Sequence, residues 1–332
     1  MSDPNMQLVR GSVEGYNLAV GEPVILQEKV LAVVGSLKAL SLSQSPLYYP
    51  QFGGEKELLD LLKLNYPDSH VVITNGAKQA IEAAFYAFQT IEGKTSVCHS
   101  APHWPTYPAL AKNRGLEFSH THCDEKTIKV ITSPNNPDGK EFDAFADIYD
   151  AAYDTPAYGS STYVISKVTL YSAAKMFGLS GLRVGWAVTQ DKKLADAMAY
   201  YVEVTTSGVA VSSQRILAEV ISKLELFGNL VFNEARTDMM INACMFNRYI
   251  AQFCEIIEGL PESGKGMFAW FKIKSEYLEA FEKALAESKV FIVTGEACGA
   301  SEKGWFRMSM GQNKNVTKKA LEELSNSLLK NV

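Results

Sequence analysis

The sequence has little cysteine, and its cysteines form no regular pattern. Cys98, Cys123, Cys244, Cys254 and Cys298 are odd in number, widely spaced and without a CxxC motif. Disulfide frameworks and cysteine zinc sites need closer and more regular spacing. This pattern therefore predicts reduced cysteines and a cytoplasmic protein.

Long apolar runs and long runs of one charge are also missing. No apolar stretch is long enough to span a bilayer, and the first residues lack a charged start followed by an apolar core. We therefore expect neither a membrane helix nor a signal peptide. The net charge is -5 and no long run of Lys and Arg occurs, which argues against a nucleic-acid surface. Small molecules or a second copy of the chain are the expected partners.

One short pattern raises the question of a metal. His120 and His122 stand beside Cys123 and Asp124. Because no second pair of ligands follows at a usual spacing, no metal site is predicted.

Apolar runs typical of strands alternate with helical patterns up to about residue 210. After the β-branched run 71–74, apolar residues recur at helical spacing from Ile81 to Phe88. Further strand-like runs lie within 95–102, 128–133, 163–172 and 183–189. Strands separated by helices predict an α/β domain with a mostly parallel sheet.

The pattern changes in the last third of the chain. It is helical from Ser212 to about Glu258, and later strand-like runs stand between helical ones. This arrangement predicts a small α+β domain. The strand-like runs are 266–273, 290–295 and 305–310, and the helical ones are 277–285 and 317–329.

Ligands collect at the carboxyl ends of strands in open α/β sheets, so the residues that follow each run matter. The run 71–74 is followed by "NGAK" at a helix start, where backbone N–H groups would suit a phosphate, although a tight turn explains the same residues. Trp104 and Tyr107 stand between prolines and could stack on a flat cofactor or pack in the core. By itself, Asn136 is typical of a turn. Asp150 either lies next to a cation or is solvated.

The stretch "YSAAKMFGLSGLRVGWAV", residues 171–188, places Lys175 and Arg183 close to an apolar strand. A desolvated lysine has a lowered pKa and can form a Schiff base, although most lysines are simply solvated. Glycines let the backbone pass close to a ligand. Arg183 offers a bidentate fork for a phosphate.

Taken together, the motifs resemble a known family. They run in the order "NPxG" from Asn136, "DxxY" from Asp150, "SxxK" ending at Lys175 and "RxS" from Arg307, with Arg183 eight residues after Lys175. This order resembles the fold type I PLP-dependent enzymes of the aminotransferase class (class I/II), over nearly the whole chain. The stretches "SPNNPDG", "YDAAYDTPAY", "GLRVGWAV" and "EVTTSGVAVSSQR" are similar to the alliinase and plant tryptophan aminotransferase branch.

The resemblance implies a fold and its division into domains. It implies a three-layer large PLP-binding domain with a mostly parallel sheet, spanning residues 46–236. Residues 1–45 and 237–332 would together form a discontinuous small α+β domain.

The resemblance also implies the cofactor, pyridoxal 5′-phosphate (PLP), and the residues that hold it. Lys175 would form the Schiff base and then move the substrate proton, while Asp150 would pair with the ring nitrogen and keep the ring an electron sink. Asn136 and Tyr153 would donate to the phenolic oxygen, and Trp104 would stack on the ring. The phosphate would lie among Gly76, Ala77, Lys78, Ser172 and Arg183.

The same resemblance implies a homodimer with shared active sites. In "YYPQFGG", Tyr49 would reach the phosphate of the neighbouring subunit. Arg307 would bind the substrate α-carboxylate with Asn136 beside it. Gly21, in "NLAVGEP", would lie in the loop that closes over that carboxylate.

Two residues bear on this mapping. Ala174 stands where the family has a hydroxyl residue, so one phosphate hydrogen bond of roughly 1 kcal/mol is lost and weaker cofactor retention is expected. Lys167 also follows a serine near a strand. It is rejected as the Schiff-base lysine because Lys175, and not an arginine, stands eight residues after it.

The function implied is that of an aminotransferase that moves the amino group of an L-amino acid to a 2-oxo acid. An alliinase-like C–S β-lyase would use the same cofactor, and no motif separates the two. A non-catalytic PLP-binding protein is a third alternative, against which Arg307 argues, since binding alone would not need it. An aromatic or bulky apolar substrate is suggested by residues that could line the pocket, namely Tyr16, Tyr48, Trp104, Tyr107 and Tyr153.

Overall fold

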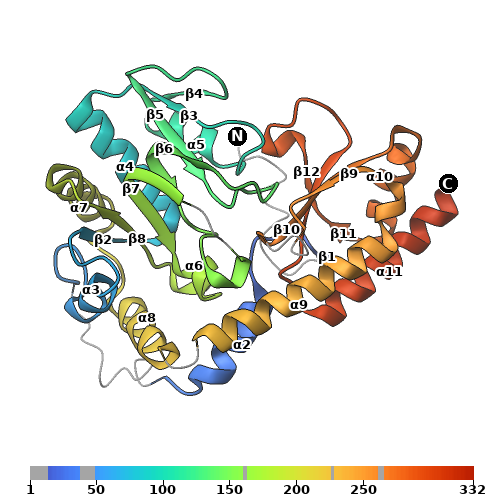
Figure 1. Ribbon diagram of the computed structural model, residues 1–332, viewed down its shortest axis with the longest axis horizontal. Coiled ribbons are helices and arrows are strands. Elements are labelled where there is room, and N and C mark those ends of the chain that lie inside the picture. The colour runs from blue at the N-terminus through green and yellow to red at the C-terminus, as the bar shows by residue number, and fades with distance from the viewer. Residues whose placement is uncertain (1–13, 38–48, 160–162, 226–227, 261–264) are drawn as a thin grey trace.

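The computed structural model describes residues 14–37, 49–159, 163–225, 228–260 and 265–332. A seven-stranded sheet flanked by helices forms one part, and a smaller four-stranded sheet with the C-terminal helices forms the other (Figure 1). Among the described residues, no helix is both long and apolar enough to cross a membrane.

The large sheet has the strand order β2-β8-β7-β6-β5-β3-β4. Every neighbouring pair is parallel except the two that involve β8, which runs antiparallel to both β2 and β7. The mostly parallel sheet is therefore confirmed. Its strands are β2 (His70–Thr74), β3 (Ser96–Cys98), β4 (Glu117–Ser119), β5 (Thr127–Thr132), β6 (Asp143–Asp150), β7 (Tyr163–Ser172) and β8 (Gly185–Thr189).

Helices cover both faces of this sheet, which makes three layers. Successive side chains of a strand point to opposite faces, and in β8 Ala187 packs in one buried cluster while Trp186 and Val188 pack in another. One face carries α4 (Gly76–Glu92), α5 (Tyr107–Asn113) and α7 (Lys192–Thr206), and the other carries α2 (Val24–Val34), α3 (Lys56–Lys63) and α8 (Val211–Leu224).

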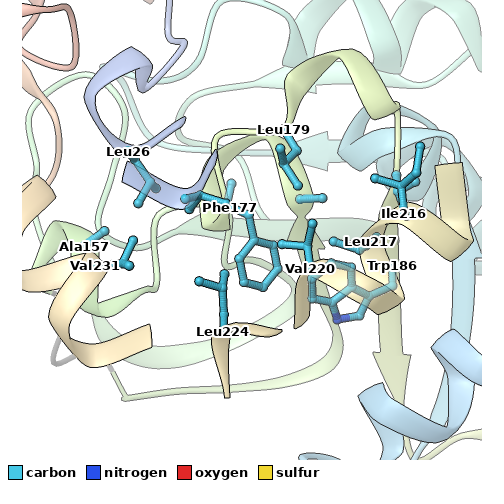
Figure 2. Close-up of a cluster of buried hydrophobic side chains, with 14 of the residues drawn as sticks. Leu26, Ala157, Phe177, Leu179, Trp186, Ile216, Leu217, Val220, Leu224 and Val231 are labelled. Atoms are coloured by element: carbon cyan, nitrogen blue, oxygen red, sulfur yellow. The ribbon is translucent and has the colours of Figure 1, made fainter. Parts of the chain in front are cut away.

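Figure 2 shows part of the second cluster. Leu26 of α2 lies near Phe177 and Leu179, which follow the short helix α6 (Ala173–Met176). Leu217 and Leu224 of α8 close the cluster from the other side. The chain that carries Lys175 is thus held by apolar packing on α2 and α8.

The smaller sheet is antiparallel, with the order β12-β13-β10-β9. The sequence prediction of helix up to Glu258 is wrong at its end, because α9 (Gly228–Tyr249) stops and β9 (Cys254–Glu258) follows. The remaining elements are β10 (Phe268–Ile273), α10 (Leu278–Ser288), β11 (Val290–Phe291), β12 (Val293–Thr294), β13 (Trp305–Ser309) and α11 (Lys314–Asn331).

The first described residues join both parts of the chain. The two-residue strand β1 (Tyr16–Asn17) pairs in parallel with β11, with Tyr16 opposite Val290. Helix α2 then packs into the cluster beneath the large sheet. Residue 236 lies inside α9, and the domain limits 46 and 236 stay predictions.

The prediction of reduced cysteines is wrong for one pair. Cys98 and Cys123 form a disulfide with a Cα–Cα distance of 5.8 Å. Cys98 ends β3, which pairs with β4, and Cys123 follows shortly after β4. Strand pairing brings together two cysteines whose spacing of 25 residues resembles no motif. Because disulfides persist mainly in oxidising compartments, the cysteine pattern no longer supports a cytoplasmic location, which stays a prediction.

Candidate active site

A cavity of about 650 Å³ lies at the carboxyl ends of the central strands. Thr132, Asp150 and Ser172, the last residues of β5, β6 and β7, all line it. Of the residues predicted from the sequence, it brings together Gly21, Ala77, Lys78, Trp104, Asn136, Asp150, Tyr153, Ser172, Lys175, Arg183 and Arg307.

Asp150 is a buried carboxyl group at the centre of the cavity. Its Oδ1 accepts a hydrogen bond from the backbone N–H of Ala152 at 3.1 Å, and its Oδ2 lies 2.6 Å from the Tyr107 hydroxyl oxygen. Burial raises the pKa of Asp150, because a charged carboxylate loses its hydration there. A cation placed next to it would reverse that shift, so the site is suited to a positively charged group.

Lys175 enters the cavity from α6, and its Nζ donates a hydrogen bond to the carbonyl of Gly21. Burial, and then the positive charge of Arg307, lower the pKa of Lys175 to about 8. A larger fraction of this amine is therefore neutral near neutral pH than of an ordinary lysine. A neutral amine is the form that attacks a carbonyl.

Arg307, on β13, reaches across from the smaller sheet. Its Nη1 donates to Asn136 Oδ1 at 2.9 Å and its Nη2 donates to the Ala19 carbonyl at 2.8 Å. The guanidinium lies over the Phe268 ring at 4.4 Å, and its buried Nε has no hydrogen-bond partner. Asn136 Nδ2 in turn donates to the Tyr153 hydroxyl at 3.1 Å. The arginine is thus positioned and retains a donor for an anionic ligand.

The start of α4 and the start of β8 meet backbone to backbone. Gly76 has a φ of 73°, and a Cβ there would come within 2.5 Å of Arg183 Nη2. A Cβ on Gly185 would lie 2.8 Å from the backbone nitrogen of Ala77. Glycine at both positions lets the Arg183 guanidinium approach the first turn of α4. Helix N–H groups and a guanidinium together suit a phosphate. Gly76 shapes this corner without lining the cavity.

Trp104 supplies an aromatic wall of the cavity. Its ring meets Tyr107 edge to face, with centroids 5.3 Å apart, and Lys78 Nζ lies over it at 5.3 Å from the centroid. Gly21 gives a close approach on the opposite segment, since a Cβ there would lie 3.1 Å from Lys175 Nζ.

Several tyrosines fall outside the cavity. Tyr49 is 85% exposed and does not line the cavity of its own chain. Tyr16 donates to Glu323 at 2.6 Å and is not a pocket residue. Tyr48 lies outside the described residues. The predicted role of Tyr49 toward a neighbouring subunit stays a prediction.

The rejected candidates have other partners. Lys167 Nζ lies 2.8 Å from Glu92 and 3.2 Å from Asp147. His120 stacks on His103, and His122 contacts Asp124 at 3.3 Å. Within the described part of the chain, no three His, Cys, Asp or Glu side chains come together as metal ligands would.

Sequence reasoning missed several residues of the site. Asn17, Glu22 and Gln312 line the cavity as polar groups, and Thr132 does so at the end of β5. The rule that strand ends carry sites could have identified Thr132. No pattern in the sequence predicts that Asn17 and Gln312 lie close together, because only the fold brings these two distant parts of the chain to one cavity.

This donor set fits a flat, cationic ring that carries an aldehyde and a phosphate. For such a ring, Lys175 would be the amine at the aldehyde, Asp150 the carboxyl group at the ring nitrogen, and Trp104 the aromatic side chain at the ring face. The Gly76 and Arg183 corner, which a larger residue at 76 would fill, suits the phosphate.

Comparison with known proteins agrees with this geometry. The family model described as Allinase matches residues 64–243, more than half of the chain. The chain belongs to the alliinase family. Tryptophan aminotransferase-related protein 2 of Arabidopsis thaliana is 28% identical to this alliinase-family chain over 277 residues, 73% of this chain and 62% of that protein. Alliin lyase of Allium cepa var. aggregatum is 26% identical over 210 residues, 57% of this chain and 45% of that protein.

Solved structures share the fold of the alliinase-family chain. Aspartate aminotransferase of Thermotoga maritima matches with a TM-score of 0.72 at 19% identity, over 98% of this chain and 99% of that one. Tyrosine aminotransferase of Leishmania infantum also has a TM-score of 0.72 at 19% identity, over 99% and 98%. The fold is thus that of fold type I PLP-dependent enzymes, as predicted.

The alliinase-family chain spans less than two thirds of the length of its first curated relatives. The matched regions cover 62% of the Arabidopsis protein above and 34% of a rice protein of the same description.

The lowered pKa of Lys175 predicts an unusual reactivity with pH. Because its pKa is about 8 and an ordinary lysine titrates near 10.4, the Lys175 amine becomes neutral at a lower pH. Labelling of the cofactor-free protein with a small aldehyde and cyanoborohydride, read by peptide mass spectrometry, should rise at Lys175 with a midpoint near pH 8. Arg307→Gln, which removes the neighbouring positive charge, should move that midpoint upward. A profile equal to that of exposed lysines would contradict the assignment.

Proposed function

We propose that this protein is a PLP-dependent aminotransferase that moves the amino group of an L-amino acid to a 2-oxo acid. The observation that carries the proposal is the convergence of Lys175, Asp150 and Arg307 on one cavity at the strand ends. The three groups suit, in turn, a carbonyl carbon, a cationic ring nitrogen and a carboxylate. Membership in a family of PLP-dependent enzymes supports the same reading.

PLP, when bound, would supply a protonated ring that withdraws electrons from the substrate Cα. The residues that would hold it are Lys175 at the aldehyde, Asp150 at the ring nitrogen, Asn136 and Tyr153 at the phenolic oxygen, Trp104 at the ring face, and Gly76, Ala77, Lys78, Ser172 and Arg183 at the phosphate.

Arg307 would bind the substrate α-carboxylate as a fork. Its guanidinium is already held by Asn136 and by the Ala19 carbonyl, so little reorientation is needed. A substrate carboxylate would displace or share those acceptors and engage the unpartnered Nε. The segment that contains Gly21 lies between Arg307 and Lys175 and would restrict water from the reacting Cα.

Lys175 would then act as the base. Its Nζ lies in the cavity, where burial and the charge of Arg307 lower its pKa to about 8, and it would take the proton from the substrate Cα. Transamination would require the same amine to return that proton on the cofactor side. The competing outcome is loss of a leaving group at Cβ.

A second candidate function is a C–S β-lyase. The family match and the 26% identity to alliin lyase favour it. It needs the same binding residues, and the difference lies in whether a leaving group at Cβ departs before the proton returns. A non-catalytic PLP-binding protein is less well supported, because binding alone does not call for Arg307.

We further propose an aromatic or bulky apolar donor and a homodimer. Trp104, Tyr107, Tyr153 and Ile81 line the cavity, which supports an apolar side chain. The 85% exposed Tyr49 is available to reach a neighbouring subunit's phosphate site.

A single half-reaction tests the function. The PLP-loaded protein is mixed with each amino acid without any oxo acid, and its spectrum, oxo acid and ammonia are measured. We expect one equivalent of oxo acid, no ammonia and loss of the starting absorption band. Continuous release of oxo acid with ammonia would instead identify a lyase.

The matched variants for this test are Lys175→Ala and Lys167→Ala. Lys175→Ala should show no turnover, because the proposed mechanism uses the Lys175 amine to take the Cα proton, whereas Lys167→Ala should react like the wild type. Full activity in Lys175→Ala would overturn the proposal.

Ala174 predicts weak retention of the cofactor. Ala174 lines the cavity next to Lys175 and offers no hydroxyl to the phosphate. Ala174→Ser should lower the dissociation constant of PLP about fivefold, since a net hydrogen bond contributes about 1 kcal/mol. Equilibrium titration followed by absorbance measures the dissociation constant of PLP. Ala174→Gly, which adds no hydrogen-bond donor, is the control. An unchanged constant in Ala174→Ser would contradict the prediction.

A further inference from the structure

A chain of short contacts leads from Asp150 away from the cavity. The Tyr107 hydroxyl oxygen lies 2.6 Å from Asp150 Oδ2 and 2.7 Å from Thr132 Oγ1. Thr132 Oγ1 lies 3.1 Å from His99 Nε2. All four side chains are buried. The chain therefore joins Asp150 to an imidazole that no part of the proposed mechanism uses.

The hydrogen-bond partner of His99 Nδ1 decides which ring nitrogen carries the hydrogen. His99 Nδ1 lies 2.8 Å from the Ser100 carbonyl oxygen, which can only accept, so Nδ1 carries a hydrogen. In a neutral imidazole, Nε2 then has no hydrogen and must accept one from Thr132.

Three contacts in the chain need three protons. The hydroxyl groups of Tyr107 and Thr132 supply two, so all three contacts are hydrogen bonds only when a third proton sits at one end, on Asp150 or on His99. With the proton on Asp150, each donor points toward His99. With the proton on His99 Nε2, each donor points toward Asp150, which is then a carboxylate.

Burial selects the first arrangement in the absence of a cation. It raises the pKa of Asp150 and lowers the pKa of His99 to about 4. Both shifts act in favour of the neutral forms, and so toward the arrangement with the third proton on Asp150. A cation beside Asp150 stabilises the carboxylate and favours the other arrangement.

We propose that Tyr107, Thr132 and His99 form a proton relay that accepts one proton from Asp150 when a cationic ring nitrogen binds there. This inference rests on the proposed function, which supplies the cation. Asp150 gives its proton to Tyr107, Tyr107 gives its own to Thr132, and Thr132 gives its own to His99 Nε2. Three O–H bonds break while two O–H bonds and one N–H bond form, and no proton is gained or lost.

Other groups face the two ends of the relay. His99 stacks on Tyr107 at 4.9 Å between centroids, lies 5.8 Å from His103, and accepts at its carbonyl from His120 Nδ1 at 3.4 Å. Charge on either neighbouring histidine would oppose protonation of His99.

Asp150 faces a different set of groups. The positive charge of Lys175 favours its ionised form, as do the Tyr107 hydroxyl and the Ala152 N–H. Tyr153 lies near enough for the Asp150 charge to raise its pKa further. These groups belong to the cavity, and apart from the Tyr107 hydroxyl, which Tyr107→Phe removes, they are the same in every variant below.

Thr132 offers a matched pair of variants. Thr132→Val keeps the shape but removes the hydroxyl, which cuts the relay at its centre. Thr132→Ser keeps the hydroxyl and serves as the control. Tyr107→Phe cuts the relay one contact closer to Asp150 and replaces Thr132→Val if that variant does not fold.

The test is nitrogen NMR of the histidine side chains, with and without bound PLP. His99 is assigned by the signal that disappears in His99→Gln. In the wild type and in Thr132→Ser, we expect the pH at which His99 titrates to rise from about 4 to above about 7 when PLP binds, because the relay leaves the transferred proton on Nε2. In Thr132→Val and Tyr107→Phe, it should not rise.

The same samples give the PLP dissociation constant. Loss of the relay removes one stabilising hydrogen bond to a charged group, so Thr132→Val should bind PLP at least about 10-fold more weakly than Thr132→Ser. An unchanged His99 titration in the PLP-loaded wild type, or the same rise in Thr132→Val, overturns the relay. If the wild type shows no PLP absorption band at all, the proposed function fails as well.

Discussion

The buried carboxyl group of Asp150 is the constraint on which the rest of the site depends. It stands at the end of β6 with one backbone donor and one phenol as partners, and burial opposes its charge. Such a group is costly unless a cation meets it or a proton neutralises it. Lys175 and Arg307 border the same cavity, but the hydrogen bonds of Lys175 Nζ and of the Arg307 guanidinium go to Gly21, Asn136 and Ala19. The ring of the proposed cofactor would supply such a cation beside Asp150.

The fold brings these groups together from distant parts of the chain. Parallel strands deliver Thr132, Asp150 and Ser172 to one edge, and the antiparallel β8 returns the backbone so that Gly185 packs on the start of α4. The smaller sheet contributes Arg307, and the segment after β1 contributes the Ala19 carbonyl that holds it. Phe177 and Leu179, which follow α6, pack in one apolar cluster with residues of α2 and α8 (Figure 2).

Local patterns in the sequence predict much of this and miss what pairing alone creates. The apolar runs that became β2, β7 and β8 are evident, and the motif order identified Lys175, Asp150 and Arg307. Strand β6 is harder to predict because Asp143 and Asp147 interrupt its apolar run. The residues of β9 continue a helical pattern, so the sequence predicts a helix there. The Cys98–Cys123 disulfide and the contacts that link His99, Thr132 and Tyr107 join residues 25 or more positions apart. Contacts between residues so far apart in the chain leave no periodic pattern in the sequence.

The central claim is that this cavity holds PLP covalently on one lysine. The most direct measurement is to incubate the protein with PLP, reduce it with borohydride and locate the added mass by peptide mass spectrometry. The account predicts one phosphopyridoxyl group per chain, on Lys175. Modification mainly of Lys78 or Lys167, or of no lysine above background, would contradict it.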